Sequence, residues 1–406
     1  MATRTATPMP RPADTPRAWR IVLAGLVFPV LAIGAGAQTL AIVGESTRPK
    51  EAAAAAPWDG SAKAHLAKGA YQGQLAAGET VAPPEPWIVE LARDAYRRQP
   101  LTPEALAVIG ASLPDEQADA FWELAAQVSR RDTLLQGLLL DHHLGHDDLD
   151  RSIRVLSQLL LVRENQRERF FAALSQALPD PRSIDPFVEI LAADPKWGDA
   201  FLVAASRNEE GLENLSRIRH RLPDGSIEAH VDQALISAFA RSGQLDLAHD
   251  LHRRLAQKQG ERPGWQASTI PPFDWRFVDE PGFRAQRDPE SEQLDLLIAR
   301  GKGGPFVTRI FRAQGSSIRL RANHQLEPTA QARRLSVSVS CAATGEVLAQ
   351  ENFRERQIAL DTAIPERCPF VAVVLSGRAW SDEPRLHGTI SPITVTFGAG
   401  GQDADQ

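Results

Sequence analysis

The densest group of potential metal ligands in this sequence lies within one short stretch. Its members are Asp141, His142, His143, His146, Asp147 and Asp148. At helical spacing His142 and His146 share a face, and imidazole together with carboxylate suits a transition metal. The stretch also fits a turn between two helices, in which Gly145 ends one helix and an Asp caps the next. We interpret it as a solvated turn, keep a metal site as the alternative, and predict neither a bound metal nor a cofactor.

A second group with possible binding chemistry surrounds one tryptophan near the C-terminus. Trp380 is followed closely by two acids, Asp382 and Glu383. An aromatic side chain in a loop stacks on a sugar ring, and an ionised carboxylate accepts hydrogen bonds from sugar hydroxyls. These three residues are therefore the candidate contacts for a saccharide ligand.

Common catalytic signatures are missing from the sequence. It contains no Gly-x-Ser-x-Gly elbow, no His-Glu-x-x-His helix and no Cys-x-x-Cys pair, so the usual hydrolase and thiol-redox residues are not in place. The run Gly301-Lys302-Gly303-Gly304 lacks the spacing of a phosphate-binding loop, and we interpret it as a hairpin between strands. We predict no catalytic residues and a protein that is not an enzyme.

The two cysteines of the chain, Cys341 and Cys368, lie next to predicted strands. Two cysteines in an exported domain favour one disulfide, with two buried unpaired thiols as the alternative. Closing a loop of this length contributes roughly 3 to 4 kcal/mol in the chain-entropy model. We therefore predict a Cys341–Cys368 bond.

The N-terminal region has the pattern of an exported protein. Residues 21–43 carry no charge and would span roughly 35 Å as a helix, while Arg17 and Arg20 precede them. We predict a cytoplasmic tail (1–20), a transmembrane anchor (21–43) and a spacer (44–57), hence a single-pass protein of the bacterial inner membrane with its bulk in the periplasm. The alternative is a signal peptide cleaved after Ala35-Gly36-Ala37.

In the rest of the chain the spacing of apolar residues changes once, from helical to strand-like. Between residues 58 and 260 apolar residues recur at helical spacing in short segments, which predicts stacked helix hairpins. Between residues 265 and 398 the pattern alternates in about eight short runs, such as Leu335 to Val339 and Ile393 to Phe397, which predicts an antiparallel β-sandwich of jelly-roll type. Residues 399–406 read as a disordered tail. The predicted class is α+β with several domains.

An aromatic motif stands at the junction of these two regions. Phe273, Trp275 and Phe277 alternate strictly after Pro271 and Pro272. We interpret them as the first strand of the sandwich, or as a latch that docks it onto the last helix.

Parts of the helical region resemble tetratricopeptide repeats. Residues 92–110, ARDAYRRQPLTPEALAVIG, are similar to the end of one repeat and the start of the next, and residues 240–248 resemble the junction between the two helices of a repeat. The whole arrangement also resembles uncharacterised envelope proteins of Gram-negative alphaproteobacteria, in which a β-domain opens on the motif found here at Pro272 to Arg276. The resemblance implies a surface for protein partners and carries no activity over.

We therefore expect a membrane-anchored periplasmic scaffold or adaptor, working in envelope polysaccharide (exopolysaccharide) assembly or export. Its helical repeats would bind envelope proteins and its sandwich a saccharide. The formal charge of −6 argues against nucleic acid as a partner. One alternative is a glycan-active enzyme, which would need two carboxylates about 5 to 9.5 Å apart in a cleft. The other is a structural spacer of the envelope.

Overall fold

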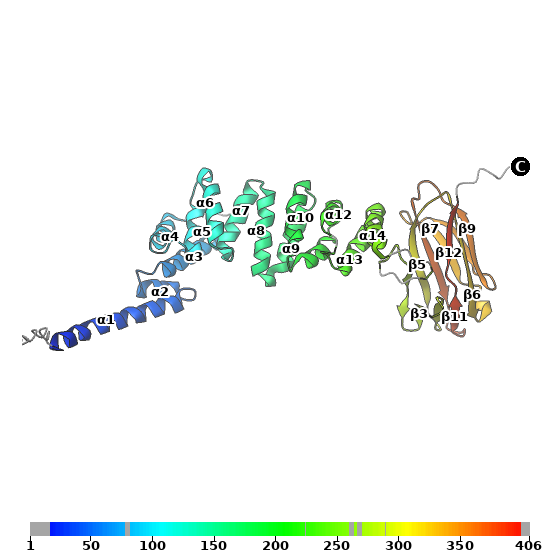
Figure 1. Ribbon diagram of the computed structural model, residues 1–406, viewed down its shortest axis with the longest axis horizontal. Helices are drawn as coiled ribbons and strands as arrows, with labels where there is room; N and C mark the ends of the chain where they lie inside the picture. Colours follow the sequence, from blue (N-terminus) through cyan, green and yellow to red (C-terminus); the bar gives the residue numbers. More distant parts are fainter. Residues whose placement is uncertain are drawn as a thin grey trace, which may run out of the picture. The chain divides into compact units, whose positions relative to one another are not determined.

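The computed structural model describes residues 17–77, 82–223, 225–259, 264–265, 270–288 and 290–398. Within these residues helices come first and antiparallel strands follow, so the predicted α+β class is confirmed (Figure 1). The chain divides into two compact units, residues 1–164 and 165–406. The second unit holds the later helices together with all the described strands. The predicted tail 399–406 and most of the predicted tail 1–20 lie outside the described residues.

The first unit is built of helices that pack against their neighbours along the chain. They are α1 (Arg17–Gly44), α2 (Pro49–Ala55), α3 (Gly60–Ala77), α4 (Pro86–Arg98), α5 (Pro103–Ala111), α6 (Asp115–Val128), α7 (Thr133–Gly145) and α8 (Leu149–Val162). Two aspartates cap helix N-termini: Asp132 accepts a hydrogen bond from the amide of Leu135 in α7, and Asp148 from that of Arg151 in α8. Local sequence therefore fixes where these two helices begin.

The predicted membrane anchor needs correction. Across the described residues, no helix is both long and apolar enough to cross a membrane, which contradicts the predicted single-pass inner-membrane location. Near the end of α1, Gln38 accepts a hydrogen bond from Trp58 and donates one to Asp59, while Ala41 is buried. This part of the run at 21–43 therefore contacts protein through polar groups. The side chains of residues 21–26, 29 and 30 lie outside the described part.

The second unit begins with a further run of helices, some of which are joined by single turns of 3₁₀ helix. They are α9 (Arg167–Ala177), η2 (Pro181–Ser183), α10 (Ile184–Ala192), α11 (Gly198–Ala205), η3 (Glu209–Gly211), α12 (Leu212–Arg221), α13 (Ala229–Arg241) and α14 (Leu245–Gln259), preceded by η1 (Glu164–Gln166) at the boundary. Stacked and edge-on rings of Phe171, Phe187, Trp197 and Phe201 fill the space between α9, α10 and α11. Aromatic packing thus organises the start of this unit.

The strands of the second unit form two antiparallel sheets. They are β1 (Arg276–Phe277), β2 (Asp279–Glu280), β3 (Phe283–Arg287), β4 (Leu294–Ile298), β5 (Gly303–Arg312), β6 (Ser317–Glu327), β7 (Ser336–Cys341), β8 (Val347–Asn352), β9 (Gln357–Ala363), β10 (Phe370–Arg378), β11 (Leu386–Ile390) and β12 (Thr394–Gly398), with α15 (Thr329–Ala332) between β6 and β7. One sheet has the order β1-β5-β10-β7-β8. The other has the order β12-β6-β11-β4-β3-β2, with β9 on the free edge of β6. We call this part, residues 276–398, the β region.

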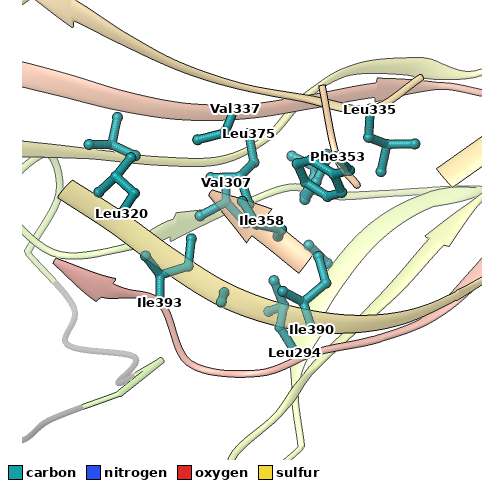
Figure 2. Close-up of a cluster of buried hydrophobic side chains, with 14 of the residues drawn as sticks. Leu294, Val307, Leu320, Leu335, Val337, Phe353, Ile358, Leu375, Ile390 and Ile393 are labelled. Carbon is teal, nitrogen blue, oxygen red and sulfur yellow. The ribbon is translucent and has the colours of Figure 1, made fainter. Parts of the chain in front are cut away.

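The two sheets share one apolar core. In β6 and β7 buried side chains alternate with more exposed ones, as a half-buried strand requires. Figure 2 shows Leu320 and Ile358 from one sheet facing Val337 and Leu375 from the other. The alternation seen in the sequence therefore reports the inward faces of β6 and β7 correctly.

The predicted disulfide is confirmed. Cys341 ends β7, Cys368 precedes β10, and their sulfurs are bonded with a Cα–Cα distance of 5.3 Å. Both residues are buried in the core of the β region. The alternative of two unpaired thiols is therefore wrong.

The aromatic motif at the junction docks the β region onto α14, which confirms the latch interpretation. The ring of Phe273 lies 5.4 Å from that of His249 and 5.3 Å from that of His252, both on α14. Asp274 accepts from the amide of Ile270 and forms a 3.2 Å hydrogen bond with His252. Both contacts join α14 to the segment that enters β1.

A buried histidine makes the stability of the β region depend on pH. His324, on β6, is 2% exposed; its Nδ1 accepts from the amide of Leu326, and its Nε2 donates to the carbonyl of Arg354. Burial lowers the pKa of His324, against the opposing effect of the Arg354 carbonyl. A lowered folded pKa means that the unfolded chain binds more protons, so stability is lost as pH falls below the ordinary value near 6.5.

We expect the free energy of unfolding of the β region to decrease between about pH 7.5 and about pH 5.5, and His324→Gln to make that decrease smaller. Urea titrations at each pH measure both. His387→Gln, at an exposed histidine on neighbouring β11, is the control and should leave the slope unchanged. An equal pH slope in the His324 variant and the unaltered protein would contradict the assignment.

Candidate functional site

The three residues expected to contact a saccharide lie in the connection between β10 and β11. The side chain of Trp380 is half exposed, at 51%, and Asp382 is exposed in the same loop. Glu383 is more covered: its backbone amide donates to the carbonyl of Trp380, and its carboxylate forms an ion pair with Arg334. The structure therefore brings Trp380 and Glu383 together.

Two arginines that the sequence analysis did not single out complete this group. The guanidinium carbon of Arg378, at the end of β10, lies 4.9 Å from the centre of the Trp380 ring. Arg334 precedes β7 and reaches the loop through Glu383. A guanidinium over an aromatic face is attracted by the ring quadrupole, which holds both side chains in place. We call Arg334, Arg378, Trp380 and Glu383 the arginine–tryptophan cluster.

An open hollow of about 320 Å³ adjoins this cluster. Its lining residues are Gly303, Gly304, Arg334, Ser336, Ser376, Gly377 and Arg378. They meet because β10 pairs with β5 on one side and β7 on the other: Gly377 faces Gly304, and Ser376 faces Ser336. A shift of register between Leu375 and Ser376 re-aims the end of β10 at this point. Strand pairing thus builds the hollow from three distant segments.

At two glycines the wall of the hollow is formed by backbone atoms, without a side chain. A Cβ on Gly303 would lie 2.6 Å from the Cα of Arg378, and one on Gly377 would lie 2.7 Å from Leu335, so neither position accepts a side chain without movement. The run 301–304 links β4 of one sheet to β5 of the other, because the two strands lie in different sheets. It is therefore a connection between sheets, and its interpretation as a hairpin between paired strands was wrong.

The hollow and its surroundings combine cationic, hydroxyl and aromatic side chains. Two guanidinium groups supply forked donors, two serine hydroxyls donate and accept, and Trp380 offers an apolar ring. Glu383 is already engaged by Arg334, so its carboxylate orients an arginine and is less open to ligand hydroxyls than the sequence suggested. Arg378, two residues before Trp380, is a local signal that the sequence analysis missed.

The histidine-rich stretch lies elsewhere, in the first unit. His142 and His143 are in the last turns of α7, and Asp148 caps α8, as the turn interpretation predicted. The helix ends one residue later than expected, with His146 rather than Gly145 at the C-cap. The amide of His146 donates to the carbonyl of His142, which satisfies a helix-end acceptor.

No family model matches the chain. No curated protein matches it either. A solved structure of an arabinose-bound α-L-arabinofuranosidase is similar over 33% of this chain and 24% of its own length, with 16% identity and a TM-score of 0.23. The matched part therefore spans about a quarter of that enzyme, and a TM-score this low supports no statement about fold or activity.

Proposed function

We propose that this chain is a non-catalytic binding protein whose β region recognises an acidic saccharide and whose helices bind protein partners. The observation that supports the first part is the pairing of Arg378 with Trp380 beside an open, serine-lined hollow. In this proposal the two sheets form a β-sandwich of jelly-roll type that carries the saccharide site. The helices would act as a repeat surface similar to tetratricopeptide repeats.

An acidic sugar fits this site better than a neutral one. A guanidinium binds a carboxylate or sulfate through two parallel hydrogen bonds, which adds geometric selection to charge. Arg378 is anchored on the Trp380 ring, and Arg334 is oriented by Glu383, so little side-chain entropy is lost on binding. The exposed part of the Trp380 ring is then available to the apolar face of the sugar.

Large apolar side chains remain exposed on the first unit, which supports a protein-binding role for the helices. They include Trp87, Leu101, Leu124, Leu144 and Leu161. Stacked helix pairs present extended surfaces to partners, and exposed apolar groups mark such surfaces. Export or assembly of an anionic polysaccharide would use both properties. The buried disulfide suits an oxidising compartment.

We expect Trp380→Ala to weaken binding of an oligogalacturonate by about tenfold, or about 1.4 kcal/mol, because the variant loses the ring and frees Arg378. Calorimetry on the full chain at low and moderate salt measures the change. Arg378→Gln should also weaken binding and should reduce its dependence on salt.

Trp87→Ala is the matched control, since Trp87 is an equally exposed tryptophan, at 56%, on α4 of the first unit. It should leave the affinity unchanged. Equal binding of a neutral galacto-oligosaccharide, or equal losses in both tryptophan variants, would contradict a site at the arginine–tryptophan cluster.

A further inference from the structure

Two helices of the first unit each present a pair of potential metal ligands one turn apart. Asp115 and Asp119 lie at the start of α6, and His142 and His146 at the end of α7. Residues four apart share a helix face, and α6 packs against α7. The two pairs therefore meet across this helix hairpin.

Three of these side chains converge on one point. Asp115, His142 and His146 each offer one ligand atom, and these atoms all lie within 4.8 Å of one another. The two imidazole rings have their centres 4.4 Å apart. Around a zinc ion with bonds of about 2.0 to 2.2 Å, ligand atoms stand about 3.3 to 3.6 Å apart. Asp115 is exposed in the first turn of α6, so its side chain has room to rotate toward the two rings.

Hydrogen bonds engage one nitrogen of each ring and leave the other available for ligation. His146 uses Nδ1 to donate to the carbonyl of His142 at 2.8 Å, which leaves its Nε2 with a lone pair. His142 uses Nε2 toward Asp119 at 2.6 Å, which leaves its Nδ1 with a lone pair. A carboxylate behind a histidine fixes the tautomer and raises its basicity in many metal sites. Asp119 is in that position.

The converging groups open into a hollow in the first unit. This hollow has a volume of about 450 Å³ and is lined by Asp115, His142 and His146 together with Asp141 and Trp122, among others. The side chain of His142 is 8% exposed, so one ligand is largely shielded from water. The hollow gives room for a fourth ligand, such as water or a group from a bound molecule. Three protein ligands with one open position are a zinc-type arrangement.

We propose that Asp115, His142 and His146 bind a divalent transition metal ion of the zinc class, with Asp119 as a positioning residue for His142. Two nitrogens and one carboxylate oxygen suit Zn²⁺ and its neighbours in the first transition row, whereas Mg²⁺ and Ca²⁺ prefer oxygen alone. The site is independent of the saccharide site proposed above. It joins α6 to α7 and presents an open coordination position in the hollow.

Titration of Zn²⁺ into the full-length protein, purified without a histidine tag, tests the proposal. We expect one ion per chain with a submicromolar dissociation constant, and a visible absorption spectrum typical of four-coordinate Co²⁺ when Co²⁺ is used instead. His146→Gln and Asp115→Asn should each weaken Zn²⁺ binding by at least about thirtyfold, and Asp119→Asn by about tenfold to a hundredfold. The far-ultraviolet circular dichroism of each variant checks that the helices remain.

His230→Gln is the matched control, because His230 pairs with Glu228 at 3.0 Å on an exposed surface of the second unit. It should bind Zn²⁺ like the unaltered protein. The proposal would be overturned by a millimolar dissociation constant or by several weak sites of equal affinity. It would also be overturned if His146→Gln and Asp115→Asn left the affinity for Zn²⁺ unchanged.

Discussion

Replacing Asp232 by Asn should lower the free energy of unfolding of the second unit by about 3 to 5 kcal/mol. Asp232 on α13 and Arg219 on α12 are 3% and 1% exposed, and they form two parallel hydrogen bonds: Nε to Oδ1 at 2.6 Å and a terminal nitrogen to Oδ2 at 2.9 Å. The variant leaves a buried guanidinium without its counter-charge. Urea unfolding, followed by circular dichroism, measures the loss.

The same helix supplies a matched control for this prediction. Arg217 and Glu213 form an exposed ion pair on α12, so Glu213→Gln should cost less than about 1 kcal/mol. The double variant Arg219→Met, Asp232→Leu should recover most of the stability, because it removes both charges together. A small effect of Asp232→Asn, or no recovery in the double variant, would show that the pair is not desolvated as described.

Loss of the Cys341–Cys368 bond should destabilise the β region by roughly 3 to 4 kcal/mol, the value of the chain-entropy model for this loop. The bond spans 27 residues and ties the end of β7 to the segment before β10, two paired strands of one sheet. The reason is the greater freedom of the unfolded chain once the link is gone. Thermal unfolding with and without reductant measures the effect.

The double variant Cys341→Ala, Cys368→Ala separates the bond from the reductant. It should unfold at the temperature of the reduced protein and should no longer respond to reductant, apart from a cavity effect at each buried site. Thiol labelling of the denatured, unreduced protein should find no free cysteine. Labelling of both residues, or a midpoint that ignores reductant, would contradict the prediction.

Much of the β region follows from local pattern. Runs such as Leu335 to Val339 alternate because one face of each strand is buried, and this period is visible in the sequence. The cysteine pairing was also accessible, since two half-cystines at strand ends leave one possible partner each. The N-terminal run misled because an uncharged stretch does not show that Gln38 hydrogen-bonds Trp58 and Asp59.

The two proposed sites could be predicted only in part, because each needs residues from distant segments. Trp380 and its acids were visible as a local group, whereas Arg334 enters the site through strand pairing between β7 and β10. In the same way, the histidines of α7 stood out, but Asp115 joins them only when α6 folds back on α7. Sequence spacing finds ligands on one element and misses those on its neighbour.

The docking of α14 onto the β region decides where the chain can be divided. A cut between α14 and β1 would strip Phe273 and Phe370 of the histidine rings that cover them, and would leave the acid of Asp274 without His252. Each fragment would then expose to solvent a surface that is buried in the whole chain, which favours aggregation. A division near Glu164, at the boundary in the chain between the two compact units, keeps those partners on one piece. Fragments for crystallisation or domain exchange are therefore best bounded there, inside the helical stretch.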